Sequence, residues 1–172
     1  MSTPTFKDTK EFQELLEYGK SVEKLFAKDC LSFISYSTKE QDMKEHWDVQ
    51  GQCIKISDKY FKFDVKSQKK NNRHDKKFSS DLTWIESKNI FGGDGWIKGK
   101  ADYIVFERER IWLIVNREQL YKLTQKKLYE NGNKKGKGKY LIYTRQNAKD
   151  VITQIPFTDM EEVEHYKILK RS

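Results

Sequence analysis

The stretch KYFKFDVKSQKK, residues 59–70, places a carboxylate, an amine and an amide on one side of a predicted β-strand. Apolar residues at alternating positions give this strand one apolar face, and Asp64, Lys66 and Gln68 then share the other. Such a polar face is either merely solvated or suited to a divalent metal ion and a phosphate. Mg²⁺ binds carboxylate oxygens, and an ammonium group stabilises negative charge on phosphate. The pattern therefore supports the hypothesis of a metal-dependent site that cleaves phosphodiester bonds.

A second carboxylate, Asp48, lies in the preceding predicted strand, HWDVQGQCIKIS at residues 46–57. A short polar turn joins it to the strand at 59–67, so the two are expected to form a hairpin. If they pair about residue 58, residue 52 faces 64, 50 faces 66 and 48 faces 68, and facing residues project to the same side. The apolar pattern shifts at Ile54, so a bulge near Gly51 is an alternative that would alter this register.

A third carboxylate, Glu23, lies on a predicted helix at residues 9–29. Its apolar residues recur at helical spacing and occupy one arc: Phe12, Leu15, Leu16, Gly19, Val22 and Phe26. Glu23 falls close to the middle of that arc, where a carboxylate is costly to bury unless something compensates it. It either reaches water at the edge of the arc or joins the other acidic groups.

The remaining elements must support these groups. Further strands are predicted at 31–37, 82–88, 101–107, 110–116, 140–145 and 151–157. A helix is predicted at 117–130, and a short one at 158–166 with Thr158 as its cap and Glu161 as the capping-box partner. This order predicts an α/β (α+β) fold with a mixed sheet. At 172 residues and without internal repeats, the chain is expected to form one domain, residues 1–172.

These motifs resemble the PD-(D/E)XK nuclease superfamily. GKSVE ends in Glu23, WDV carries Asp48, and FDVKSQ carries Asp64, Lys66 and Gln68, in the order that the superfamily shows. The likeness is closest to the Holliday-junction-resolvase-like branch and to small phage or viral members. It covers about residues 12–68, and the rest of the chain fits as a plausible continuation.

The resemblance implies a restriction-endonuclease-like core, with a mixed central β-sheet flanked by helices. It also implies a Mg²⁺-dependent (or Mn²⁺-dependent) deoxyribonuclease, an endonuclease for which branched or junction DNA is suggested by analogy alone. A cytoplasmic protein of viral or mobile-element origin is expected, and a homodimer, which the sequence itself does not show. Trp47 departs from the family pattern by replacing the proline before the first acid.

Each residue then has an expected role. The predicted metal ligands are Glu23, Asp48, Asp64 and the main-chain carbonyl of Val65. Lys66 would orient the attacking water and stabilise charge in the transition state, and Gln68 extends the same row. The predicted catalytic residues are Glu23, Asp48, Asp64, Lys66 and Gln68.

A rival acid–x–lysine element, Glu86-Ser87-Lys88, lies in the predicted strand at 82–88. It could replace the Asp64–Lys66 element, and Asp64 would then take the earlier acidic role. The Asp64 element is favoured because its strand alternates cleanly and because Glu23 and Asp48 precede it in the expected order.

Basic segments surround these motifs, and the net charge of +8 is compatible with a polyanionic partner such as DNA. The predicted DNA-binding residues are Lys69, Lys70, Arg73, Lys98 and Lys100. The loop FGGDGW, residues 91–96, either contacts phosphate, with Trp96 stacking on a base, or forms a structural hairpin with Trp96 in the core. Solvated lysines on a soluble protein are the alternative explanation of the charge.

Other classes of protein are less consistent with the sequence. Cys30 and Cys53 lack zinc-ligand spacing, and the start of the chain has no apolar run typical of a secretory signal. No apolar stretch is long enough for a membrane helix, so a cytoplasmic location without membrane contact is expected. Two alternatives to a nuclease remain: a nucleic-acid-binding module that kept the fold without catalysis, and a basic structural or inhibitor protein.

Overall fold

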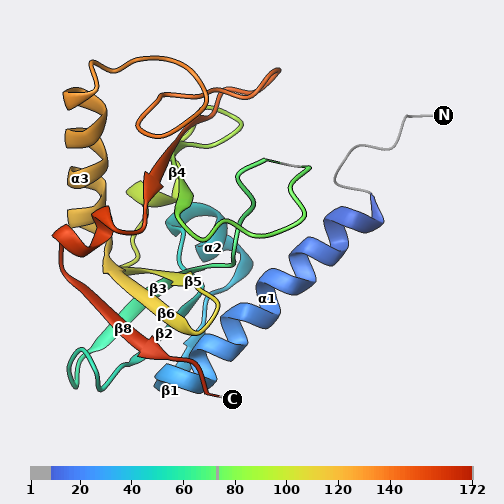
Figure 1. Cartoon of the computed structure of the whole chain (residues 1–172). Coiled ribbons are helices and arrows are strands. Elements are labelled where there is room, and N and C mark those ends of the chain that lie inside the picture. The colour runs from blue at the N-terminus through green and yellow to red at the C-terminus, as the bar shows by residue number, and fades with distance from the viewer. Residues whose placement is uncertain (1–8, 73, 172) are drawn as a thin grey trace.

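The computed structural model describes residues 9–72 and 74–171 (Figure 1). In chain order the elements are α1 (Lys10–Cys30), β1 (Ser32–Tyr36), α2 (Lys39–Glu45), β2 (Val49–Gln52), β3 (Tyr60–Lys66), β4 (Leu82–Lys88), the 3-10 helix η2 (Trp96–Lys98), β5 (Tyr103–Glu107), β6 (Ile111–Asn116), α3 (Arg117–Glu130), β7 (Val151–Pro156), the 3-10 helix η3 (Asp159–Glu162) and β8 (His165–Leu169).

A six-stranded mixed sheet, in the order β1-β2-β3-β5-β6-β8, forms the centre of the fold. Its β3–β5 pair is parallel, and the other neighbouring pairs are antiparallel. Between β3 and β5 the chain leaves this sheet to form β4 and η2, and β4 pairs with β7 in a separate two-stranded antiparallel sheet. The fold is therefore a mixed α/β protein, as the sequence predicts.

The two faces of the central sheet have separate hydrophobic cores, because strand side chains alternate between faces. On one face α1 buries Val22 and Phe26, and the ring of Phe26 packs edge-on against Phe63 and Trp112. On the other face α3 and the β4–β7 sheet pack against Ile104 of β5. Figure 1 shows α1 and α3 on opposite sides of the sheet.

Most elements predicted from the sequence are present. The helix at 117–130 and the strand at 82–88 have the predicted bounds, and α1 begins and ends one residue later than predicted. Residues 140–145 do not form a strand and make only isolated bridges, such as Tyr143 with Ile152. The C-terminal segment forms η3 and then β8 instead of a capped helix, and the Thr158 side chain makes no capping bond.

The predicted hairpin exists, but its predicted register is wrong. Gln52 pairs with Tyr60, not with residue 64, and Val49 pairs with Phe63. The chain closes earlier because residues 53–57 turn on themselves, with Ile56 and Ser57 N–H groups both donating to the carbonyl of Cys53. No bulge interrupts this pair at Gly51; the irregularity lies between β1 and β2. The shift is even, so the predicted faces are retained.

Within the part of the chain that the structure describes, no helix is long and apolar enough to cross a membrane. Cys30 and Cys53 are free thiols.

Candidate active site

The corrected register brings the two predicted aspartates together at the place where β2 and β3 separate. The last pair of the ladder is Val49 with Phe63, so the next residues, Asp48 and Asp64, lie opposite each other beyond it. The N–H of Asp48 donates to the Phe63 carbonyl at 2.9 Å, and Oδ2 of Asp48 accepts a hydrogen bond from the Val65 N–H at 2.7 Å. The side chain of Asp48 thus binds the backbone between Asp64 and the predicted lysine.

Lys66 completes this group from the same strand. Its Nζ lies 2.7 Å from Oδ1 of Asp64, and both side chains are largely buried. The parallel register pairs Asp64 with Ile104 and Lys66 with Phe106, so both project to the face of the sheet that the β4–β7 sheet covers. The spacing of two residues therefore places acid and amine on one face, as predicted.

Burial and mutual repulsion make the two carboxyl groups of this site hard to ionise. Burial raises the pKa of Asp64, although the Lys66 ammonium opposes that shift. Burial and then the charge of Asp64 raise the pKa of Asp48 to about 8. Burial lowers the pKa of Lys66, but the charges of Asp64 and Asp48 outweigh it and the net shift is upward. A pKa of about 8 leaves Asp48 mostly protonated at neutral pH, so a bound cation would displace that proton.

Glu23 approaches the same group from α1. It is half-buried, and burial followed by the charge of Asp48 raises its pKa to about 7. Glu23 is therefore close enough to Asp48 for the charge of Asp48 to act on it, and its role as a metal ligand stays a prediction. Glu23 follows the buried Val22 on α1, so its carboxylate is partly removed from water at a cost in free energy.

A divalent metal ion fits part of this arrangement. When Asp48 is ionised, the buried Oδ2 of Asp64 has no hydrogen-bond partner among the described residues, which leaves one lone-pair direction for a ligand. A protonated Asp48 hydrogen-bonds to the Asp64 carboxylate instead. The carbonyl of Val65 points to the same side of the strand as its N–H, which Asp48 holds. Asp48, Asp64 and the Val65 carbonyl are the atoms that would hold the ion.

The complete predicted ligand set is not preformed. Across residues 9–72 and 74–171, no three His, Cys, Asp or Glu side chains are grouped closely enough to hold a metal ion. Glu23 thus lies near Asp48 without joining a three-carboxylate cluster. Gln68 lies apart as well: β3 ends at Lys66, the Gln68 N–H donates to Glu107, and its side chain lines a different hollow with Lys77.

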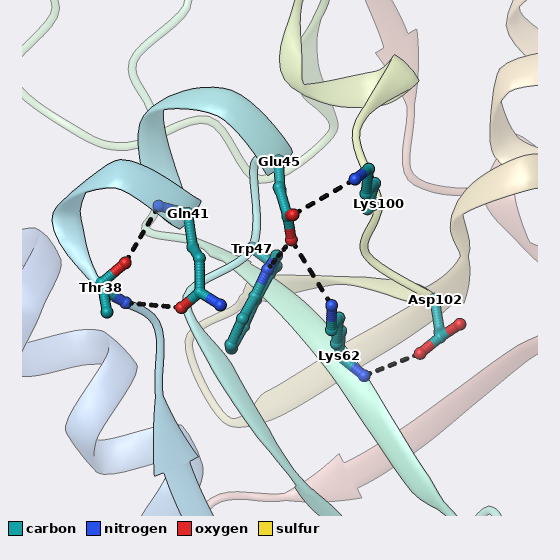
Figure 2. Close-up of polar contacts among 7 residues, drawn as sticks. All are labelled: Thr38, Gln41, Glu45, Trp47, Lys62, Lys100 and Asp102. Atoms are coloured by element: carbon teal, nitrogen blue, oxygen red, sulfur yellow. Dashed lines mark hydrogen bonds and ion pairs between the residues drawn. The ribbon is translucent and has the colours of Figure 1, made fainter.

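A network centred on Glu45 fixes the chain at the entrance to β2 (Figure 2). The Trp47 indole N–H donates to Oε2 of Glu45 at 2.8 Å, Lys62 lies 3.5 Å from the same oxygen, and Lys100 lies 3.2 Å from Oε1. These partners hold the pKa of Glu45 below its usual value, with the Trp47 hydrogen bond the largest cause. Trp47, the residue before Asp48, is buried and anchors Asp48 by packing.

Helix α2, which supplies Glu45, was not predicted. Its start is a capping box in which the Thr38 side chain accepts from the Gln41 N–H and the Gln41 side chain accepts from the Thr38 N–H (Figure 2). The pattern Thr-x-x-Gln was readable in the sequence and could have revealed the helix.

The predicted DNA-binding residues are divided among different places. Lys69 and Lys70 line a cleft beside Lys66. Lys98 forms an ion pair with Asp94, and Lys100 forms one with Glu45, so both are engaged within the protein. Arg73 lies outside the described residues.

The cleft has a volume of about 560 Å³ and lies between the β4–β7 sheet and Lys66. Its other lining residues include three aromatic side chains and two basic ones that the sequence analysis missed or left open: Trp84, Trp96, Tyr143, Lys137 and Arg145. The Lys66 Nζ lies 4.8 Å from the centre of the Trp96 ring, so the cleft opens directly beside the acidic group.

The rival element contributes to this cleft through its acid alone. Glu86 lines the cleft, and burial raises its pKa against the influence of Lys66 and Arg145. Lys88 is exposed at the end of β4 and bridges to Asp94. Glu86 and Lys88 therefore do not form a second acid–amine pair of the kind found in β3.

The glycine-rich loop has a structural role. A Cβ atom on Gly95 would lie 2.3 Å from the carbonyl oxygen of Glu86, so the close approach of this segment to β4 requires glycine. The Gly95 N–H donates to the Ser87 carbonyl at 3.1 Å, and Trp96 then packs edge-on against Phe106. Trp96 is thus partly in the core and partly in the cleft wall.

Comparison with known protein families, curated proteins and solved structures finds no match to this chain.

Proposed function

We propose that this protein is a metal-dependent endonuclease of the PD-(D/E)XK type that hydrolyses phosphodiester bonds in DNA with Mg²⁺ or Mn²⁺. The observation that carries the proposal is the group formed by Asp48, Asp64 and Lys66, in which a buried carboxylate oxygen of Asp64 lacks a partner in the described chain. With only one largely buried amine beside it, this acidic pair ionises fully only when a further cation is bound.

In the proposed reaction the bound ion would polarise the scissile phosphate and acidify a water molecule. Asp48 and Asp64 hold their carboxylates at the end of the hairpin, with Asp48 fixed by the Val65 N–H. Lys66 presents its ammonium 2.7 Å from Asp64, where it can orient a water molecule and stabilise charge that develops on the phosphate. Glu23, near Asp48, can accept a proton or bind a water molecule.

Several finer parts of the proposal rest on the resemblance of the motifs. These are a restriction-endonuclease-like fold for the mixed sheet, branched or junction DNA as the substrate, a homodimer, and a cytoplasmic protein of viral or mobile-element origin. The central sheet with α1 on one face and α3 on the other is compatible with such a core.

The test is cleavage of labelled linear, supercoiled and branched DNA by the full chain in Mg²⁺ or Mn²⁺, compared with EDTA. The parent is expected to nick at least one substrate with metal, and Asp64→Asn and Lys66→Ala are expected to lose that activity. Lys88→Ala is the matched control, since it removes an amine with the same sequence spacing but outside the site. Cleavage by Asp64→Asn at the parental rate would refute the assignment.

A second candidate function is a nucleic-acid-binding module without catalysis. The observation that favours it is the lack of a preformed three-carboxylate group in the described residues, together with the direct Asp64–Lys66 ion pair. Binding of DNA in EDTA with no cleavage in either metal would support this function. A basic structural protein, the third alternative, would bind neither DNA nor RNA at low salt.

A further inference from the structure

Residue pairing in and beside the β4–β7 sheet places the rings of Trp84 and Tyr143 along one wall of the cleft beside Lys66. We call this wall the aromatic floor. In the β4–β7 sheet Glu86 pairs with Ile152, and Tyr143 forms an isolated bridge with the same Ile152. Paired residues project to one side, and Trp84 lies two residues before Glu86 on the same strand. Trp84, Glu86, Ile152 and Tyr143 therefore share one face, and all four line the cleft.

The other side of the two-stranded β4–β7 sheet packs against the protein interior. Ile85 and Ile155 are fully buried in the core cluster that contains Ile104. The outer face could have been polar like an ordinary solvated surface, but it carries a tryptophan and a tyrosine whose ring centres are 6.1 Å apart. These rings are half-buried, so part of each is accessible from the cleft.

Basic side chains surround this aromatic floor. Among the described residues, five of them line the cleft, namely Lys66, Lys69, Lys70, Lys137 and Arg145, together with one acidic side chain, Glu86. Lys137 lies 6.0 Å from the centre of the Tyr143 ring, and Arg145 is held by an ion pair with Asp150. A ligand with a flat aromatic part and attached negative charge matches this lining.

The size and position of the cleft further restrict the class of ligand that can bind there. Its volume of about 560 Å³ is in the ordinary range for small-ligand sites of roughly 300–1,000 Å³. The bases of an intact duplex are stacked inside the helix and cannot reach such a floor, whereas an unpaired base can. Glu86 could accept a hydrogen bond from the amino group of a base.

We infer that this cleft binds one unpaired nucleotide of a DNA or RNA strand, with its base on Trp84 and Tyr143 and its phosphates at the basic rim. The cleft places the unpaired nucleotide next to Lys66 and Asp64. The biological role of this binding therefore rests on the proposed function. The inference assigns to the protein a preference for single-stranded or locally unpaired substrate.

The test is equilibrium binding of fluorescent oligonucleotides to the full chain in EDTA, followed by anisotropy. The probes are a short single-stranded DNA, the same sequence as RNA, and the blunt DNA duplex. A single strand should bind more tightly than the duplex. Trp84→Ala and Tyr143→Ala should each weaken single-strand binding by about 5- to 100-fold, as loss of one base–aromatic stack predicts, and leave duplex binding unchanged.

Two controls make the result specific. Tyr129→Ala removes an exposed tyrosine from α3, away from the cleft, and should bind like the parent. Trp84→Phe keeps a flat ring and should keep most of the affinity. Because Tyr143 lies outside the regular strands, its variant remains informative if Trp84→Ala unfolds, which circular dichroism would show.

Duplex binding as tight as single-strand binding would overturn the inference, and so would parental single-strand affinity in both alanine variants. Whichever single-stranded probe binds with the higher affinity, DNA or RNA, identifies the type of strand that the cleft prefers. Either result supports the inference. Absence of cleavage in both Mg²⁺ and Mn²⁺, with binding that still depends on Trp84, would refute the nuclease proposal and leave the nucleotide-binding inference standing.

Discussion

Two segments of this chain have the same acid–x–lysine spacing, Asp64 to Lys66 in β3 and Glu86 to Lys88 in β4, yet they fold into different surroundings. In β3 the amine lies 2.7 Å from its acid and both are largely buried. In β4 the acid faces the cleft while Lys88 is exposed and pairs through its backbone with the Asp94 segment. The alternation of apolar and polar residues in the sequence does not by itself distinguish the β3 segment from the β4 segment.

The difference is made by the neighbouring strand. β3 is central and has the end of β2 beside it, which brings Asp48 against Asp64. β4 belongs to a two-stranded sheet, and its neighbour β7 places Ile152 opposite Glu86. Asp48, opposite Asp64, distinguishes the candidate catalytic strand from its copy, because the acid near Glu86, Asp150, already forms an ion pair with Arg145.

The largest expected effect separates the two acids. Asp64→Asn should lower the rate of DNA cleavage in Mg²⁺ by about 10³-fold or more, because a metal ligand contributes several kcal/mol to the transition state. Glu86→Gln should retain cleavage within about tenfold, since removal of a cleft contact affects substrate binding more than chemistry. Nicking of supercoiled plasmid measures both rates. An equal loss in the two variants would transfer the active site to β4.

The second effect separates the two lysines. Lys66→Ala should reduce cleavage by about 10²-fold, the magnitude expected when one charge-stabilising donor is removed. Lys88→Ala should stay within about twofold of the parent, because its amine does not reach the acidic pair. Single-turnover rates at saturating enzyme are the measurement. A larger loss for Lys88→Ala than for Lys66→Ala would reverse the comparison.

A third effect concerns metal binding by the acids of β2 and β3. Mn²⁺ at a concentration 100-fold above its dissociation constant should stabilise the folded chain by about 2.7 kcal/mol, which raises the melting temperature by roughly 5–10 °C. Asp48→Asn should remove most of this shift, and Glu86→Gln should keep it. Differential scanning fluorimetry with and without Mn²⁺ gives the comparison. An undiminished shift in Asp48→Asn would exclude that carboxylate as a ligand.

The smallest expected effect is on the stability of the fold, through the packing of Gly95 against β4. Gly95→Ala would push a methyl group to 2.3 Å from the Glu86 carbonyl oxygen, and should destabilise the chain by about 1–3 kcal/mol. Gly19→Ala is the matched control, since no atom other than the neighbouring backbone of α1 itself lies within 4 Å of its Cβ position. It should be neutral or stabilising by about 1 kcal/mol. Urea denaturation measures both, and equal stability of the two variants would contradict the packing argument.

The sequence was sufficient for elements with strong local patterns. The apolar arc of α1 and the alternation in β4 predict those elements within a residue. In α1 only the second half of the arc is buried, at Val22 and Phe26, whereas Leu15 and Leu16 of the same arc are exposed. Strand β8 was missed because it lies at the edge of the sheet with most of its residues partly exposed, so its apolar pattern is weak. The predicted strand at 140–145 fails because the chain pairs there only through isolated bridges.

The candidate site was predictable only in part. The acid and amine of β3 follow from alternation, but the approach of Asp48 depends on a turn whose length the sequence did not reveal. The cleft could not be predicted, because Trp84 and Tyr143 meet through β7, a strand that follows both in the chain. Long-range pairing of this kind leaves no local pattern.

The parallel contact of β3 with β5 has a consequence for the order of folding. The β2–β3 hairpin closes through a short turn, whereas Phe63 meets Tyr103 only after the whole β4 excursion has looped out, at a greater cost in chain entropy. We therefore expect the hairpin that carries both aspartates to form early and the cleft wall to dock late. The nascent protein would then bring its two aspartates together before the cleft that we propose for an unpaired nucleotide has formed.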